Sequence, residues 1–120
     1  QLRIDFNNNT IAPVHRLDKS TSGLLICSKN SQAASVLSQA FQNRQVEKYY
    51  LAISDNKPSK KQGLISGDML RTRNGSWKLS KAKTNPAVTQ FFSYSLNIIN
   101  NSRGRLFVLK PLTGKTHQLR

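Results

Sequence analysis

One segment of this 120-residue chain has the apolar spacing of a helix, and the other apolar segments are short and strand-like. Within residues 31–43 the apolar side chains recur at intervals of three and four, which places them on one helical face. These side chains are Ala33, Ala34, Leu37, Ala40 and Phe41. Asn30 or Ser31 offers an N-cap oxygen for this helix. One helix among several strands predicts an α+β fold with a mixed, mainly antiparallel sheet and few helices.

Turn-forming residues separate the strand-like segments. Residues 24–28 form a short apolar run that predicts a buried strand. Asn74-Gly75 predicts a hairpin turn among short strand fragments. The remaining expectations are a loop or frayed strand over residues 1–13, strands over 46–53, 87–94 and 105–109, fragments over 64–86, and a turn at 100–104. The chain is long enough for one domain.

The charge of the chain favours a polyanionic partner. Lys and Arg total 19 against 5 acidic residues, so the net charge is +14. A field of this sign attracts nucleic acid and makes binding salt-dependent. A membrane partner is not expected, because no basic amphipathic helix and no run of ~20 apolar residues is present. Cys27, the only cysteine, is expected to be a buried core residue in a reducing cytoplasm.

The stretch VHRLDKSTSGLL, residues 14–25, gathers polar groups ahead of an apolar run. A Ser-His-Asp triad is not supported, because no G-x-S-x-G elbow surrounds Ser22. A metal site is also not supported, since His15 and His117 are the only histidines and no carboxylate cluster accompanies them. No helical pattern follows Asp18, which argues against an N-cap. On the residues alone, Asp18 stays open between a structural and a catalytic role.

Three segments together resemble one enzyme family. His15-Arg16-Leu17-Asp18, followed by TSGLL at residues 21–25, resembles the HRLD-x-x-TSG-L-L signature of RNA pseudouridine synthases of the RluA type. VEKYYLA at residues 46–52 resembles the K-x-Y-x-A strand of that family. LTGKTHQLR at residues 112–120 resembles its L-x-TG(R/K)-THQ(I/L)R segment. The likeness extends from about residue 13 to residue 120, in the family's order.

The resemblance implies isomerisation of uridine to pseudouridine in RNA, with no cofactor and no metal. The catalytic aspartate of the family falls on Asp18. Its carboxylate would attack the sugar or assist elimination to a glycal, and both routes stay open. Tyr50 matches the active-site tyrosine, whereas Tyr49 faces the other side of the strand. Arg120 matches the arginine that pairs with the catalytic carboxylate.

Residues around these three positions are given supporting roles by the resemblance. Arg16 matches an arginine that helps displace the target base, and a plain phosphate contact is the alternative. Gly23 is expected to allow a close backbone approach. Gln118 is expected to brace the Arg120 segment through hydrogen bonds. The scaffold of the loops is assigned to His15, Thr21, Ser22, Gly23 and His117.

A uridine in structured RNA must be extruded before it can react, so the protein has to hold the surrounding RNA. Basic residues on both sides of Asn74-Gly75 are expected to contact phosphates, and a merely solvated face is the alternative. These residues are Lys57, Lys60, Lys61, Arg71, Arg73, Lys78, Lys81 and Lys83. Trp77 lies among them, either as a core residue or as a stacking platform.

Catalytic domains of the family are longer than this chain. Family segments are expected before residue 1 and after Arg120, so the chain reads as part of a catalytic domain, weakly stable and inactive by itself. Ribosomal RNA is the expected substrate ahead of transfer RNA, and a monomer is expected by analogy. The alternative function is a catalytically inactive RNA-binding module or RNA-folding factor. DNA binding is not supported, because the sequence contains no helix-turn-helix or zinc-binding motif.

Overall fold

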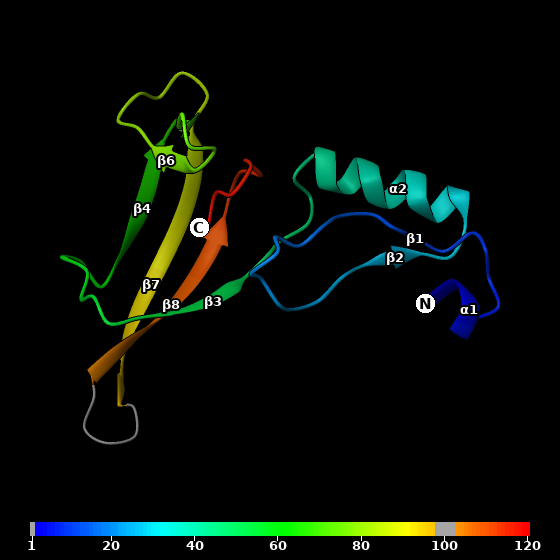
Figure 1. Ribbon diagram of the computed structural model, residues 1–120, viewed down its shortest axis with the longest axis horizontal. Coiled ribbons are helices and arrows are strands. Elements are labelled where there is room, and N and C mark those ends of the chain that lie inside the picture. The colour runs from blue at the N-terminus through cyan, green and yellow to red at the C-terminus, as the bar shows by residue number, and fades with distance from the viewer. Residues whose placement is uncertain (1, 98–102) are drawn as a thin grey trace. The chain divides into compact units, whose positions relative to one another are not determined.

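The computed structural model describes residues 2–97 and 103–120. The chain divides into two compact units, Gln1–Val46 and Glu47–Arg120. All strand pairs found in the described residues are antiparallel, and one helix exceeds four residues (Figure 1). The predicted α+β class with a mainly antiparallel sheet is therefore confirmed. Within the same part of the chain, no helix has the length and apolar character needed to cross a membrane.

The first unit consists of a short strand pair and one helix of three turns. Asn30 Oδ1 accepts a hydrogen bond of 2.8 Å from Ala33 N, so the predicted cap begins the helix. Its observed end lies one residue before the predicted one. The elements of this unit are α1 (Leu2–Asp5), β1 (Ala12–Pro13), β2 (Cys27–Ser28) and α2 (Ser31–Gln42).

The buried strand predicted over residues 24–28 is wrong for residues 24–26. Strand β2 contains Cys27 and Ser28 alone, and Leu24 is 91% exposed. The reason is the length of the partner, because β1 pairs with β2 at two positions only and the preceding residues 24–26 stay exposed. Cys27 is half-buried instead of buried. Residues 1–13, expected as a loop or frayed strand, include the short helix α1 as well as β1.

The second unit is built on a four-stranded sheet with the order β3-β8-β7-β4 (Figure 1). The two long strands β7 and β8 form its centre, and β3 and β4 form its edges. Strands were expected in each of these regions, and the expected turn at residues 100–104 falls largely outside the described residues. The bounds are β3 (Tyr50–Ser54), β4 (Gln62–Gly67), β7 (Ala87–Asn97) and β8 (Arg103–Pro111).

The two faces of this sheet differ in burial. Side chains alternate between faces along a strand, so Tyr50 and Ala52 share a face with their partners Leu109 and Phe107. We call this the Tyr50 face; Ala87, Thr89 and Ser93, which are buried, also belong to it. On the opposite face, Leu51, Ile53 and Leu64 are 72%, 66% and 64% exposed. Packing in this unit is therefore concentrated on the Tyr50 face.

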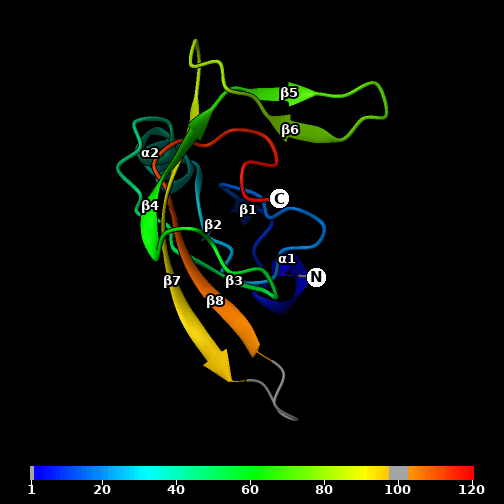
Figure 2. The same cartoon turned by 90° about the vertical axis from the view of Figure 1, so that its left-hand side faces the viewer.

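A hairpin of β5 (Met69–Arg71) and β6 (Trp77–Leu79) follows β4 and projects from the sheet (Figure 2). The hairpin predicted at Asn74-Gly75 is confirmed: Thr72 N donates to Ser76 O at 2.7 Å, and Gly75 has a φ of +77°. The base of the hairpin is tightly fastened. The Asp68 carboxylate accepts hydrogen bonds from Thr84 N and Asn85 N at 3.1 and 2.9 Å.

Candidate functional site

Asp18 lies in the loop between β1 and β2 of the first unit. It is half-buried, and its carbonyl oxygen accepts a hydrogen bond from Thr21 N at 2.9 Å. This bond closes a turn immediately after the carboxylate, so the backbone at Asp18 is held locally. Arg16, two residues earlier, is exposed.

His15 ties the same loop to its surroundings. Its Nε2 accepts a hydrogen bond from Ile26 N at 3.0 Å. Its ring stacks on Phe41 of α2, with centroids 4.9 Å apart and an interplanar angle of 26°. These two contacts are of the kind that a scaffold role for His15 requires, and the role itself stays a prediction.

Gly23 is explained by its backbone conformation and not by crowding. Its φ is +144°, which non-glycine residues rarely adopt. No atom lies within 4 Å of the place where a Cβ would stand. The close backbone approach expected at Gly23 is therefore not found among the described residues. Its neighbours Thr21 and Ser22 are half-buried and exposed, respectively.

Tyr50 begins β3 and stands opposite Leu109 of β8. It is half-buried on the Tyr50 face, whereas Tyr49 is 58% exposed. Strand alternation places the two aromatic rings on opposite sides.

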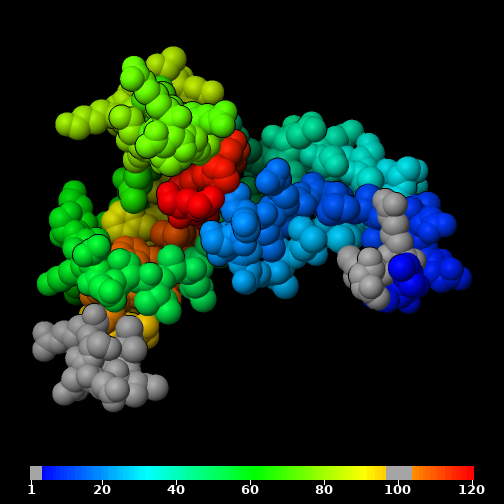
Figure 3. Space-filling view, in the orientation of Figure 1, coloured from blue at the N-terminus to red at the C-terminus, as the bar shows by residue number. Residues whose placement is uncertain are grey.

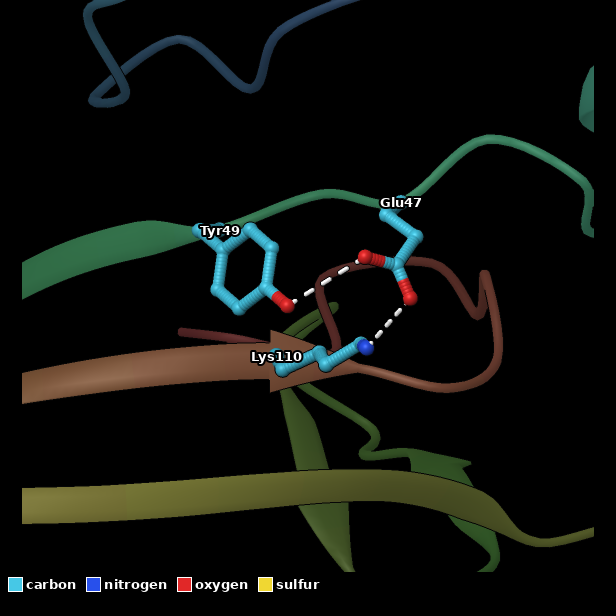
Figure 4. A network of polar contacts seen from close by, with 3 residues as sticks. All are labelled: Glu47, Tyr49 and Lys110. Carbon is cyan, nitrogen blue, oxygen red and sulfur yellow. Dashed lines mark hydrogen bonds and ion pairs between the residues drawn. The ribbon is translucent and has the colours of Figure 1, made fainter.

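A polar network on the side of Tyr49 fastens the entry of β3 to the end of β8 (Figure 4). Lys110 Nζ donates to Glu47 Oε1 at 2.5 Å, and the Tyr49 hydroxyl donates to Glu47 Oε2 at 3.3 Å. The bond from Lys110, with its positive charge, lowers the pKa of Glu47. The same bond raises the pKa of Lys110. Sequence reasoning missed this network, because residues 47 and 110 meet only through the strand register.

Gln118 anchors the C-terminal segment, residues 112–120, to strand β7. Its Oε1 accepts hydrogen bonds from Thr113 Oγ1 at 2.8 Å and Lys115 N at 2.9 Å. Its Nε2 donates to Val88 O at 3.0 Å and to Thr89 Oγ1 at 2.9 Å. One side chain thereby joins two loop positions to two strand positions.

Arg120 lies at the rim of a hollow of about 260 Å³ on the Tyr50 face. Trp77 and Leu109 are among the apolar residues that line it. Trp77 also meets His117 edge to face, with ring centroids 6.3 Å apart. Figure 3 shows the C-terminal segment, in red, directly beside the yellow-green β5–β6 hairpin. The hairpin and the C-terminal segment therefore build this hollow together.

Every basic residue assigned to RNA binding is exposed, and these residues are Arg16, Lys57, Lys60, Lys61, Arg71, Arg73, Lys78, Lys81 and Lys83. Exposure fits phosphate contacts and a solvated face equally, so their role stays a prediction. Trp77 is half-buried.

The structure brings two of the three predicted catalytic positions into one unit. Leu109 is the strand partner of Tyr50 and also lines the hollow beside Arg120. Asp18 belongs to the other unit. Its approach to Arg120 therefore stays a prediction, as do the catalytic roles of all three residues.

Residues 1–120 match the family model for RNA pseudouridylate synthase. The chain belongs to the RNA pseudouridylate synthase family. An uncharacterised RNA pseudouridine synthase of Haemophilus influenzae is 55% identical over 107 residues, which make up 89% of this chain and 46% of that protein. Ribosomal large subunit pseudouridine synthase D of Borreliella burgdorferi is 40% identical over 99% of this chain and 36% of its own length.

A solved structure of this synthase family has the same fold. Human RNA pseudouridylate synthase domain containing 1 superposes with a TM-score of 0.82 at 31% identity. The match covers 99% of this chain and 51% of the human chain. The chain thus spans about half, or less, of the length of these relatives.

Sequence reasoning also missed Leu109 and Arg105. Leu109 is an ordinary apolar residue in a strand, and only its register opposite Tyr50 relates it to the site. Arg105 begins the strand predicted over residues 105–109. Residues two apart in a strand share a face, so its spacing from Phe107 could have indicated a cation on the packed face.

Proposed function

We propose that the protein containing this chain isomerises uridine to pseudouridine in structured RNA. The observation that carries this proposal is the family match over residues 1–120, which includes the segments bearing Asp18, Tyr50 and Arg120. Ribosomal RNA is the proposed substrate ahead of transfer RNA, because the relative from Borreliella burgdorferi is named for the large ribosomal subunit. A monomer acting in the cytoplasm completes this proposal.

The proposed reaction breaks the N1–C1′ bond, turns the uracil and forms a C5–C1′ bond, after which C5 loses its proton. Asp18 supplies the carboxylate that attacks C1′ or removes a sugar proton. Its position suits either role, since the turn to Thr21 and the contacts of His15 hold the loop. A fixed mount of this kind keeps a reacting group in productive geometry.

Tyr50 and Arg120 are proposed to complete the site. The Tyr50 ring offers an aromatic surface to the extruded base, and Arg120 offers a guanidinium that can pair with a carboxylate. The neighbouring hollow has apolar walls from Trp77 and Leu109 with a polar rim at Arg120. An apolar cavity with a few polar groups is the usual form of a small-ligand site.

The proposed RNA path follows the exposed cations of the β3–β4 loop and the β5–β6 hairpin. With a net charge of +14, the chain attracts the RNA backbone over a broad surface. Extruding a paired base costs stacking and pairing energy, and phosphate contacts on the flanking nucleotides offset that cost.

Tritium release tests the proposal directly. The full-length protein is incubated with RNA that carries tritium at uracil C5, taken from cells lacking the protein. Release occurs only when C5 becomes the glycosidic atom. We expect release by the native protein and by Asp5→Asn, an exposed carboxylate in α1. Asp18→Asn, which keeps the side-chain shape, is expected to lower the rate at least about 10³-fold.

Two outcomes would contradict this function. RNA binding without tritium release by the native protein would favour an RNA-binding module or RNA-folding factor. Binding of DNA at least as tight as binding of RNA, measured by competition, would argue against a synthase that acts on RNA.

A further inference from the structure

The strand order forces the loop between β3 and β4 to cross the sheet. These strands lie at opposite edges, with β8 and β7 between them. Residues 55–61 must therefore span three strand spacings, about 14 Å. The end of the loop is fastened to β7, because Ser93 N donates to Lys61 O at 2.7 Å.

Two hollows lie between this loop and the sheet, with volumes of about 360 and 750 Å³. Lys61, Ser95 and Arg105 line both of them. Lys57 lines the larger hollow, and Ser93 lines the smaller. We refer to the pair as the loop hollows; all of their lining residues belong to the second unit.

Arg105 is held in a fixed orientation between the loop hollows. Its Nη1 donates to Ser95 Oγ at 2.7 Å, and its Nη2 donates to Ser93 Oγ at 2.7 Å and to Ser93 O at 3.2 Å. Its Nε is buried and has no hydrogen-bond partner among the described residues. Each serine hydroxyl accepts from the guanidinium and therefore keeps its own proton for another acceptor. The arrangement is a preorganised set of donors.

The charges around the loop hollows are not balanced. Lys57, Lys61 and Arg105 have no ion pair among the described residues, and Asp55 is the only acidic lining residue. Three cations against one carboxylate leave a net charge of +2 in a concave site, where a positive potential is focused. Such a site favours an anion that can accept several hydrogen bonds, and a phosphodiester has that chemistry.

We propose that Arg105, Lys57 and Lys61 form a phosphate subsite that holds the RNA backbone away from the reacting uridine. Arg105 lies four residues before Leu109, the strand partner of Tyr50 on β8, which corresponds to about 13 Å along the strand. The C-terminal segment with Arg120 begins just after Pro111. The subsite therefore contacts a nucleotide distant from the target base, and its identification rests on the proposed function for the choice of RNA as the partner.

Binding of total ribosomal RNA by the full-length protein tests this subsite. Arg105→Lys keeps the charge but loses the planar fork that bonds both serines, and Lys61→Gln removes a cation that lines both hollows. Lys29→Gln is the matched control, because Lys29 has the same charge, is exposed and lines neither hollow. We expect the first two variants to weaken binding about tenfold and the control to weaken it less than about twofold.

Equal losses for Lys29→Gln and Lys61→Gln would overturn the subsite, because diffuse charge would then explain binding. Native affinity in both Arg105→Lys and Lys61→Gln would overturn it as well. Thermal unfolding identifies a misfolded Arg105→Lys, in which case the comparison of Lys61→Gln with Lys29→Gln decides. Tritium release separates the two proposals. Release by the native protein, together with equal RNA affinities for all variants, would contradict the subsite alone. The expected order of affinities without tritium release by the native protein would contradict the isomerase activity alone.

Discussion

Gln118 shows how a neutral side chain can position a segment that carries a predicted catalytic residue. Arg120 is two residues away and exposed, so its own side chain does not anchor the backbone. His117, immediately before Gln118, has a φ of +55°, a conformation that costs roughly 1–2 kcal/mol for a non-glycine residue. The four hydrogen bonds of Gln118 hold the segment against this cost.

We predict that Gln118→Leu lowers the free energy of unfolding by about 2 kcal/mol, because four polar partners lose their bonds in a half-buried site. Urea unfolding of the full-length protein measures the change. Gln62→Leu, an exposed glutamine on β4, is expected to stay within about 0.5 kcal/mol of the native protein. Equal effects of the two substitutions would show that the network does not stabilise the segment.

At the scale of elements, the pairing of β3 with β8 decides where Tyr50 lies. Tyr50 is the first residue of an edge strand, where a frayed end would move the ring. The Glu47–Lys110 ion pair and the Tyr49 hydroxyl fasten the chain just before this point (Figure 4). The ionised form of Glu47 therefore supports the position of Tyr50.

This ion pair predicts a pH dependence of stability. The pKa of Glu47 is lowered by Lys110, so the stabilisation is present above the ordinary carboxyl pKa and is lost as the pH falls through the lowered value. The pKa of Lys110 is raised, so the same stabilisation is lost again as the pH rises through that raised value. We expect Glu47→Gln to lower the urea midpoint at neutral pH and to match the native protein in strong acid.

Lys110→Met serves as the second arm of this test, because it removes the other partner of the same pair. The double variant is expected to lose about as much free energy of unfolding as either single variant, since both changes break the same interaction. A pH-independent difference between Glu47→Gln and the native protein would mean that the ion pair contributes nothing.

At the scale of the whole chain, little apolar surface is enclosed. In the described residues, Ile11 and Ala87 are the only hydrophobic side chains that are buried. Leu24, Leu51, Ile53 and Leu64 are left largely to solvent, and β3 and β4 present open sheet edges. Hydrophobic burial is the main favourable term in folding, and open apolar edges promote association.

We predict that the isolated residues 1–120 are weakly stable and inactive in the tritium assay. The reason is the small enclosed core, which gives little free energy against the cost of ordering the chain. Calorimetry and circular dichroism during heating measure this property. A cooperative transition above about 65 °C would contradict the prediction.

Local sequence was sufficient for the elements that depend on near neighbours. The helix start at Asn30 and the turn at Asn74-Gly75 were predicted, because a cap and a hairpin turn use residues a few positions apart. The strand predicted over residues 24–28 formed at Cys27 and Ser28 alone, because its extent depends on a partner that those residues do not specify. The family was recognisable from three motifs, and the predicted roles of Asp18, Tyr50 and Arg120 came with that resemblance.

The sequence by itself therefore determined the charge, the helix, the hairpin and the family. Only the tertiary structure decided that Lys110 meets Glu47 across 63 positions, that Gln118 reaches Val88, and that Arg105 lies beneath the β3–β4 loop. The physical reason is strand register: a shift by one residue would turn every side chain to the other face. That register is set by packing over the whole sheet and not by any local segment.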